Sequence, residues 1–281
     1  MTRSRVAEEV PLESTSPFEL RVDLSKGVSE SFVKQSLETG GVGFLHSFTT
    51  GSAVDGPGVR LVAWTAGCQF RCLYCHNPDT WNMMNGMAIS LDRAIAGIRK
   101  YCHGLKIMAG GFTLSGGEPL MQDRFVVRLL AAAREMGVHT ALDTNGYLGE
   151  RLSDEDLEQI DVVLLDIKAW ERERHLQLTG KDVVPTLDFA RRLAQRRRPV
   201  WLRYVFVPGL TDDEDEIKQI AAFAAGLGNV ERVDVLPFHQ MGRPKWQKLG
   251  LNYTLNDVQP ATHEMVERAC EQFRAVGLKA Y

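Results

Sequence analysis

The sequence lacks three features that mark large classes of protein: long apolar runs, an excess of basic residues and many cysteines. Apolar runs such as VVLL at 162–165 are far shorter than the about 18 residues that a membrane-spanning helix needs. The N-terminal residues carry arginines but no apolar stretch behind them, so they do not resemble a secretory signal peptide. We therefore expect a cytoplasmic protein that makes no membrane contact.

Basic charge is not in excess either. The 33 Lys and Arg residues are outnumbered by 36 Asp and Glu residues, which gives a formal net charge of −3. Such a chain has no positive field of the kind that binds nucleic acid by releasing counterions, so nucleic acid is excluded as a primary ligand. With 281 residues, 44% of them hydrophobic, the chain is long enough for one large core, and we expect a monomer.

Cysteine is rare, yet three of the five cysteines lie within residues 68–75. Cys68, Cys72 and Cys75 form a C-x3-C-x2-C pattern in the segment GCQFRCLYCHN, residues 67–77. In a reducing compartment such a group is more typical of metal binding or catalysis than of disulfides. The pattern therefore marks the first candidate site.

The N-terminal part of the chain differs in composition from the rest. Residues 1 to about 40 are rich in Ser, Glu, Thr and Gly and show little periodicity. This composition predicts a mobile extension over residues 1–40, ahead of a domain that spans residues 41–281.

From Leu61 onward, extended apolar segments alternate with amphipathic ones, as in βα units with a parallel sheet. We expect strands at 61–66, 111–116, 138–143, 161–168, 200–207 and 232–238. We expect helices near 90–103, 122–136, 153–159, 185–196, 213–226 and 257–276, with Ser90 and Thr211 as N-caps. Six units are too few for the closed eight-stranded barrel. The predicted fold is therefore α/β, a partial (β/α)6 barrel with an open parallel sheet and helices outside.

Polar groups stand at the end of each expected strand. In chain order they are the three cysteines, SGGE (115–118), DTNG (143–146), Asp166 with Lys168, Arg203 within the fifth strand, and His239. The carboxyl ends of parallel strands meet at one edge of the sheet. Charged groups at every strand end would make a poor core, so we expect one site at this edge.

Three explanations of the three cysteines stay open on the residues alone. A closed zinc site needs four ligands, and neither His76, directly after Cys75, nor Cys102, on an expected helix, is well placed as the fourth. Ordinary buried thiols are the second explanation, against which the polar neighbours in RCLYCHN argue. An iron–sulfur cube held by three cysteines is the third, and it leaves one iron free to bind a substrate.

The other strand-end groups also have structural explanations. SGGEP can form a turn at the end of a strand, and DTNG can form a turn that caps a helix. Asp166 and Lys168 can form a salt bridge, and His239 can be a structural residue whose ring nitrogens are hydrogen-bonded within the protein. In a binding site, two glycines would let main-chain groups approach a small ligand, and Glu118 would complement an ammonium group. Asp166 and Lys168 stand at i and i+2 on a strand and therefore face the same side.

Several of these segments together resemble a known family. GCQFRCLYCHN is similar to the cluster loop of radical S-adenosylmethionine (SAM) enzymes, in which a [4Fe–4S] cluster binds the amino and carboxylate groups of SAM through its open iron. The resemblance is narrowed to the pyruvate formate-lyase activating enzymes by DGPGVR (55–60), SGGEP (115–119), DTNG (143–146), LLDIK (164–168), WLRYVFVPG (201–209) and LPFH (236–239). It extends from about Gly43 to the C-terminus.

The resemblance implies a role for each group. Cys68, Cys72 and Cys75 would bind the cluster. Contacts to SAM would come from Tyr74, His76, Gly116, Gly117, Glu118, Asp166, Lys168 and His239. A monovalent cation, K⁺ or Na⁺, would be bound next to the SAM carboxylate by Asp143, Thr144 and Asp166. The glycyl loop of a partner protein would be received by Asp55 and Arg203.

The implied activity is that of an activase. The reduced cluster would cleave SAM to methionine and a 5′-deoxyadenosyl radical, which removes a hydrogen atom from a glycine of a glycyl-radical enzyme, pyruvate formate-lyase. Flavodoxin or ferredoxin would supply the electron. Two alternatives stay open: an activase of another glycyl-radical enzyme or of an anaerobic ribonucleotide reductase, and a non-catalytic zinc-binding protein that has kept the fold.

Overall fold

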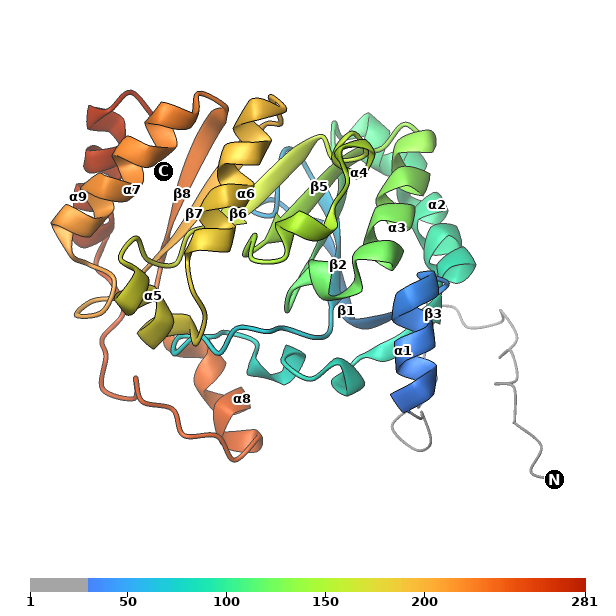
Figure 1. The fold of residues 1–281 in the computed structure, drawn as a ribbon, viewed down its shortest axis with the longest axis horizontal. Coiled ribbons are helices and arrows are strands. Elements are labelled where there is room, and N and C mark those ends of the chain that lie inside the picture. The colour runs from blue at the N-terminus through green and yellow to red at the C-terminus, as the bar shows by residue number, and fades with distance from the viewer. Residues whose placement is uncertain (1–29) are drawn as a thin grey trace.

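Residues 30–281, the part of the chain that the structure describes, form one open sheet flanked by helices in the computed structural model (Figure 1). The sheet has eight strands in the order β3-β1-β2-β4-β5-β6-β7-β8. The strands are β1 (Val42–Ser52), β2 (Arg60–Thr65), β3 (Met87–Ser90), β4 (Gly111–Gly116), β5 (His139–Thr144), β6 (Val162–Asp166), β7 (Val200–Phe206) and β8 (Val230–Pro237). Strands from β2 to β8 in this order run parallel, whereas β1 pairs antiparallel with both β2 and β3.

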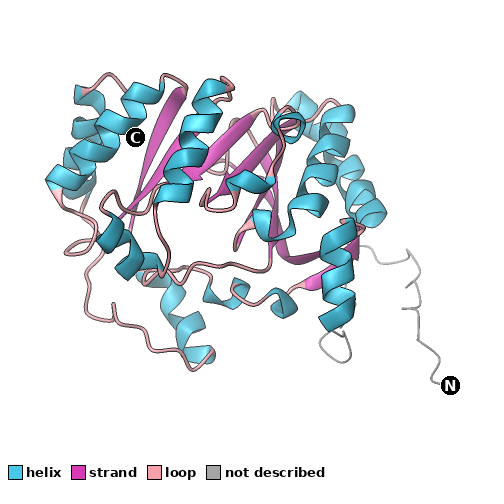
Figure 2. Ribbon diagram, in the orientation of Figure 1, coloured by secondary structure: helices cyan, strands magenta, loops and turns pink. Residues whose placement is uncertain are grey.

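The helices that connect the parallel strands lie outside the sheet (Figure 2). The α-helices of residues 30–281 are α1 (Glu30–Thr39), α2 (Leu91–Ile107), α3 (Asp123–Glu135), α4 (Asp154–Leu157), α5 (Arg172–Thr179), α6 (Val184–Gln195), α7 (Glu214–Leu227), α8 (Arg243–Lys248) and α9 (His263–Ala275). Short 3-10 helices are η1 (Pro78–Thr80), η2 (Met83–Asn85), η3 (Pro119–Gln122), η4 (Gly149–Arg151) and η5 (Gln240–Gly242). No helix in this part of the chain is long and apolar enough to cross a membrane.

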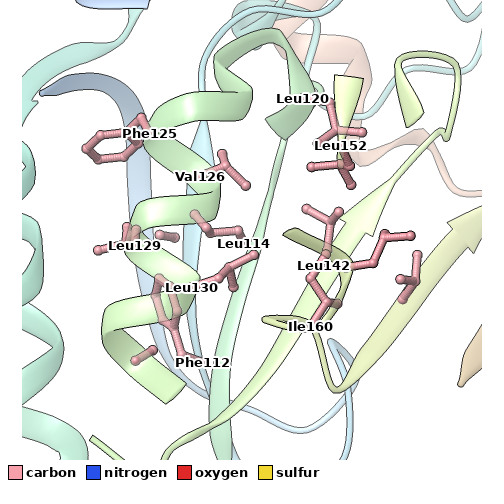
Figure 3. Packing of buried hydrophobic residues seen from close by; sticks show 14 of the residues in the cluster. Phe112, Leu114, Leu120, Phe125, Val126, Leu129, Leu130, Leu142, Leu152 and Ile160 are labelled. Carbon is pink, nitrogen blue, oxygen red and sulfur yellow. The ribbon is translucent and has the colours of Figure 1, made fainter. Parts of the chain in front are cut away.

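Helix α3 shows why the helices pack on the sheet. Its buried side chains recur at helical spacing and form one apolar face, made by Phe125, Val126, Leu129, Leu130 and Ala133. Figure 3 shows this face beside Phe112 and Leu114 of β4, in one buried cluster. Burial of each large apolar side chain contributes about 1.5–3 kcal/mol, so this face is sufficient to hold α3 on the sheet. The carboxyl ends of the strands are left for polar groups.

The six expected strands are all present and make up the parallel part of the sheet. The partial barrel is therefore confirmed, with an antiparallel extension, β1 and β3, that the sequence does not predict. In β1 the exposed residues Thr49–Gly51 and two register shifts against β2 interrupt the alternation that would identify a strand.

The N-terminal extension differs in part from its expected form. Residues Glu30–Thr39 form α1, and the side chain of Arg128 in α3 donates a hydrogen bond of 3.0 Å to the Thr39 carbonyl oxygen. The last ten residues before Gly40 in the expected extension are therefore helical, which their composition does not predict. Residues 1–29 lie outside the described part of the chain.

The helix ends follow the expected signals only in part. Ser90 caps α2, because its hydroxyl accepts a hydrogen bond from the main-chain N–H of Arg93. Thr211 does not cap α7, and that prediction is wrong. Asp213 is the cap instead, and the buried Thr211 hydroxyl accepts from the Val207 N–H inside the turn after β7. Helices α5 and α8 are not predicted by the sequence.

Gln122 joins β1 to the rest of the molecule. Its side chain is buried, and its Oε1 accepts a hydrogen bond of 2.6 Å from the Phe44 N–H. Its Nε2 donates to the carbonyl oxygens of Phe44 and Ala66, at 2.8 and 2.9 Å. These bonds lie next to the register shift between β1 and β2, which begins at Leu45. One side chain therefore satisfies main-chain groups of β1 and of Ala66, the residue that follows β2.

We expect Gln122→Met to lower the free energy of unfolding by about 2–4 kcal/mol, because buried main-chain groups lose partners at about 1–3 kcal/mol each. Gln247→Met, on the exposed surface of α8, is the control, with an expected change below about 0.5 kcal/mol. Urea unfolding followed by circular dichroism measures both variants. Equal stability of the two would contradict the role of Gln122.

Candidate functional site

A cavity of about 730 Å³ opens at the carboxyl ends of the parallel strands. Among the residues expected at the site, its lining contains Asp55, Cys68, Cys72, Tyr74, Cys75, His76, Gly116, Gly117, Asp143, Asp166, Lys168, Arg203 and His239. Glu118 and Thr144 do not line it. The sheet therefore gathers groups that are far apart in the sequence, as the strand-end argument predicts.

The three cysteines lie on a segment that closes on itself, residues 67–81, called here the cysteine loop. The Gly67 N–H donates to the Thr80 carbonyl oxygen over 2.7 Å, and the Cys68 N–H donates to the Trp81 carbonyl oxygen over 3.2 Å. Inside the loop the Cys75 N–H donates to the Cys72 carbonyl oxygen over 3.1 Å. Main-chain bonds therefore close the loop, and side-chain bonds from Arg71 and Thr80 to main-chain carbonyl oxygens inside it add to them.

Helix α5 holds the cysteine loop from outside. The N–H groups of Arg71 and Leu73 donate to the carbonyl oxygens of Thr179 and Leu178, at 2.7 and 3.0 Å. These carbonyls belong to the last turn of α5, where carbonyl groups have no partner within the helix. The loop and the helix end therefore satisfy each other.

The other end of α5 is held by the buried Glu216 of α7. Its carboxylate accepts hydrogen bonds from the N–H groups of Trp170 and Glu171, at 2.8 and 3.0 Å, and forms a salt bridge of 2.8 Å with Arg174. A buried carboxylate is stable when it has such partners. Since α5 itself has the mostly polar sequence RERHLQLT, its position depends on these contacts, and periodicity alone does not predict it.

The three thiols form no disulfide, and burial raises the pKa of each above its ordinary value. For Cys72, burial and the neighbouring Cys75 and Asp166 raise the pKa to about 12, although Lys168 opposes the shift. Thiolates this close repel one another, so they need a positively charged group to stay deprotonated. The iron ions of an iron–sulfur cluster are such a group.

The donor groups do not fit the zinc alternative. The ring of His76 lies edge-on to that of His239, with centroids 4.8 Å apart. Cys102 lies on α2, outside the cavity lining, with its Sγ 3.5 Å from the Met136 carbonyl oxygen. Within residues 30–281, no three His, Cys, Asp or Glu side chains converge on a position for a single metal ion. Three thiolates without a fourth side chain fit a [4Fe–4S] cluster with one open iron.

Two ion pairs form the charged part of the wall. Arg203 Nη1 lies 2.9 Å from Asp143 Oδ2 and 3.7 Å from Asp55 Oδ1, and Lys168 Nζ lies 2.9 Å from Asp166 Oδ2. Burial opposes both positive charges, but the nearby carboxylates raise the pKa of Arg203 and of Lys168 above their ordinary values. At these strand ends three carboxylates face two cations, and the third basic residue of the lining, Lys245, is paired with Asp79 at 3.4 Å. The strand ends therefore have negative charge left for a cationic ligand group.

Gly116 and Gly117 form a wall of main chain at the end of β4. A Cβ on Gly116 would lie 2.2 Å from the Thr65 nitrogen, and one on Gly117 would lie 2.4 Å from the Gly67 carbonyl oxygen. Gly116 also has a φ of +129°, which other residues rarely adopt. Both glycines are therefore required by the packing of β4 against β2 and the cysteine loop, and they leave main-chain groups at the cavity.

Glu118 and Thr144 lie inside the protein. The fully buried Glu118 accepts hydrogen bonds from the Leu120 N–H (2.9 Å), the Thr144 hydroxyl (2.7 Å) and the Asn145 N–H (2.8 Å). Its carboxylate joins the turn after β4 to the turn after β5, away from the wall where the expected ammonium contact would form. The sequence carries a signal for this role, because Pro119 follows directly and Glu118 is the N-cap of η3.

Three polar atoms of lining residues are buried and have no partner within the described residues. They are the hydroxyl of Tyr74, Nε of Arg203 and Nδ1 of His239. An unpaired buried polar atom costs free energy unless a ligand binds it. These atoms therefore indicate a polar ligand next to the cysteines.

The lining also contains residues that the sequence analysis misses. His46 of β1 has its Nε2 3.0 Å from Asp79 Oδ2, and Lys245 of α8 has its Nζ 2.6 Å from Asn77 Oδ1. Both contacts attach distant segments to the cysteine loop. No signal identifies them, because neither β1 nor α8 is predicted by the sequence.

Known proteins show the same combination of fold and sequence. Residues 54–182 match the family described as a 4Fe–4S single cluster domain. The pyruvate formate-lyase-activating enzyme of Staphylococcus aureus is 41% identical over 244 residues, which cover 84% of this chain and 96% of that protein. A solved domain of pyruvate-formate lyase-activating enzyme from Bacteroides vulgatus has a TM-score of 0.52 and 25% identity, over 61% of this chain and 98% of the domain. A radical SAM methyltransferase from Sphaerobacter thermophilus shares the fold, with a TM-score of 0.58 and 16% identity, over 79% of this chain and 65% of its own.

A partial α/β barrel with three cysteines after its first parallel strand defines a radical SAM enzyme. The chain belongs to the family of pyruvate formate-lyase-activating enzymes, radical SAM activases that use a [4Fe–4S] cluster and SAM. The resemblance based on the sequence motifs is therefore confirmed, and so is the enzymatic nature of the chain.

Glu118 gives the site a testable pH dependence. Burial raises its pKa from 4.5 to about 7 despite the three donors, so its contribution to stability is present below pH 4.5 and is lost as the pH rises through about 7. We expect the free energy of unfolding of the wild type, relative to Glu118→Gln, to fall by up to about 3 kcal/mol between pH 5 and pH 8. Urea unfolding at both pH values measures this. A constant difference would mean that the donors keep Glu118 ionised throughout.

Proposed function

We propose that this chain activates pyruvate formate-lyase by generating a radical on one of its glycines. The observation that supports the proposal is the cavity in which Cys68, Cys72 and Cys75 meet the polar ends of the parallel strands. Cys68, Cys72 and Cys75 would hold a [4Fe–4S] cluster, which would supply the single electron needed to split SAM into methionine and an organic radical, and that radical would take a hydrogen atom from the glycine. The residues of the chain bind and orient the reactants and exclude water.

We assign the contacts to SAM to the lining residues Tyr74, His76, Gly116, Gly117, Asp166, Lys168 and His239. The glycine main chain lets the methionine part approach closely, and Glu118 orients this wall from behind. Lys168 complements the carboxylate of SAM, and Asp166 beside it accepts hydrogen bonds from ribose hydroxyls. Tyr74 and His239 offer the polar atoms that lack partners among the described residues.

A monovalent cation, K⁺ or Na⁺, fits the same wall. At the strand ends Asp55, Asp143 and Asp166 outnumber Lys168 and Arg203, which supports a cation between Asp143 and Asp166, at the ends of the neighbouring strands β5 and β6. Carboxylate oxygens are the ligands that hard cations prefer. The hydroxyl of Thr144 donates to Glu118, so the proposal depends on the two carboxylates more than on this third residue.

Asp55 and Arg203 are suited to receive the glycyl loop of the partner protein. Both line the cavity, and the Arg203 Nε is buried without a partner within residues 30–281. A guanidinium with a free N–H and a nearby carboxylate can bind the carbonyl and amide groups of an extended peptide. In this proposal flavodoxin or a ferredoxin supplies the electron, and the activase acts as a monomer whose catalytic domain spans residues 41–281.

The proposal is tested by anaerobic reconstitution with iron and sulfide, reduction, and addition of SAM with and without pyruvate formate-lyase. We expect about four irons per chain, 5′-deoxyadenosine as a product, and a glycyl-radical EPR signal that requires the partner. Cys75→Ser should lose most of the iron and both products. Cys102→Ser is the matched control, since Cys102 is also partly buried but lies outside the cavity, and it should keep them.

The products separate the alternatives. Formation of deoxyadenosine without the glycyl radical would show that the chain cleaves SAM but activates a partner other than pyruvate formate-lyase. Bound zinc with neither product would overturn the proposal and restore the non-catalytic alternative.

The cation is tested by measuring SAM affinity in K⁺ and in the bulky tetramethylammonium ion. We expect binding to the reconstituted wild type to weaken about tenfold without K⁺, which corresponds to about 1.4 kcal/mol. Asp143→Asn should bind SAM weakly in both salts, whereas the exposed Asp188→Asn should behave as the wild type. Equal affinity of the wild type in both salts would show that Asp143 serves only as the partner of Arg203.

A further inference from the structure

The face of the sheet that carries the cavity, called here the inner face, continues beyond the cavity on the neighbouring strands β7 and β8 (Figure 1). In β7, Trp201, Arg203 and Val205 alternate with buried residues and therefore share one face. Arg203 and Val205 line the cavity, and Trp201 stands two residues before Arg203. Across the two strands, Trp201 is opposite Arg232, and Arg203 is opposite Asp234. Trp201 and Arg232 therefore lie next to the cavity wall, on the inner face.

The side chain of Arg232 is held in a fixed orientation at this place. Its Nε donates a hydrogen bond of 2.6 Å to Asp234 Oδ1. Its guanidinium carbon lies 4.8 Å from the centroid of the Trp201 ring and 4.5 Å from the centroid of the Tyr281 ring. Trp201 itself packs on a buried apolar cluster of β5 and β6. An ion pair and two cation–π contacts together restrict the plane of the guanidinium.

Tyr281 is positioned by its main chain. Its N–H donates to the Val233 carbonyl oxygen over 3.0 Å, and its carbonyl oxygen accepts from the Val235 N–H over 2.9 Å. Ala280, directly before it, is buried in the apolar cluster that contains residues of α9. Successive side chains of an extended segment point to opposite sides, so the Tyr281 ring lies on the inner face, where the residue is 60% exposed.

Two arginines leave hydrogen-bond donors free on this face. Arg203 Nε is buried and has no partner within residues 30–281. Arg232 uses only its Nε on Asp234, so within the same part of the chain its two NH2 groups have no acceptor. Asp234 balances the charge of Arg232, and Asp143 balances that of Arg203. The face therefore offers donors to uncharged acceptors, and the carbonyl groups of an extended main chain are such acceptors.

We propose that Trp201, Arg232 and Tyr281 form a docking surface for the extended segment of the glycyl-radical enzyme on one side of its glycine. The inference rests on the proposed function and extends it, because it adds contacts beyond Asp55 and Arg203. From Arg203 to Trp201 the distance along the strand is about 7 Å, which is about two residues of an extended peptide. The guanidinium of Arg232 donates to main-chain carbonyl oxygens there, and the two rings shield these bonds from water.

Arg232→Gln tests the docking surface, because it removes the free donors and the cation that contacts both rings. We measure formation of the glycyl radical by EPR at increasing concentrations of pyruvate formate-lyase, with the reconstituted full chain. We expect KM for this partner to rise about tenfold, as for an arginine at the centre of an interface. We expect kcat to change by less than about twofold, because the interaction is the same before and during the reaction. Formation of 5′-deoxyadenosine without the partner is measured on the same samples.

Arg191→Gln is the matched control. Arg191 also contacts a ring, that of Phe223 at 5.3 Å, and also pairs with an aspartate, Asp188 at 2.7 Å. It lies on α6, outside the sheet, so its KM for pyruvate formate-lyase should equal that of the wild type.

Tyr281→Ala keeps the inference testable if Arg232→Gln does not fold. The residue is exposed, and its main-chain bonds to β8 do not depend on the side chain. The substitution removes one ring but keeps the ion pair of Arg232 with Asp234. We expect KM for pyruvate formate-lyase to rise about threefold.

The outcomes separate the inference from the proposed function. Unchanged KM values in folded Arg232→Gln and Tyr281→Ala would overturn the inference and leave the proposed function intact. A rise in Arg232→Gln alone would also overturn it, because the loss would then come from Asp234 and the neighbouring Arg203. Loss of partner-independent deoxyadenosine would overturn it as well, since the substitution would then have damaged the SAM site. A wild-type chain that forms no glycyl radical on pyruvate formate-lyase would overturn the proposed function itself.

Discussion

The close main-chain contact between the ends of β2 and β4 determines where everything else in the cavity lies. Gly117 and Glu118 donate hydrogen bonds to the carbonyl oxygens of Thr65 and Gly67, and no Cβ fits between the two segments. The contact sets the start of the cysteine loop against the glycine wall. Thiols and main-chain groups are therefore fixed relative to each other before any ligand arrives, which is the condition for a site with defined geometry.

Because of the same contact, the side chain of Glu118 points into the protein. Its carboxylate there fixes the position of the end of the next strand, β5. It accepts hydrogen bonds from Thr144 and Asn145, so the turn after β5 takes its position from the turn after β4. Asp143 precedes Thr144 and points to the opposite side, into the cavity, because successive side chains of a strand alternate. The three hydrogen-bond donors offset part of the free-energy cost of burying the Glu118 carboxylate. The part that they do not offset raises its pKa.

The parallel part of the fold is predictable because each strand is a short apolar run that ends in a polar group, and those polar groups are the cavity wall. The helices α5 and α8 are not, because contacts from distant residues hold them: Glu216 at the start of α5, and the bond from Trp246 to Cys75 for α8. A local pattern does not contain such contacts. A local pattern also does not show whether the side chain of Glu118 points into the protein or toward the cavity, because the two glycines before it allow either direction.

The bond between Trp246 and Cys75 joins positions 171 residues apart in the sequence. On a ribosome that adds about 5–20 residues per second, the thiols are made roughly 10–30 s before the helix that covers them. In this interval three adjacent cysteines are open to oxidants and to stray metal ions. The order of synthesis thus creates a vulnerable period for the nascent enzyme, and its length is set by the time needed to translate the segment from η1 to α8.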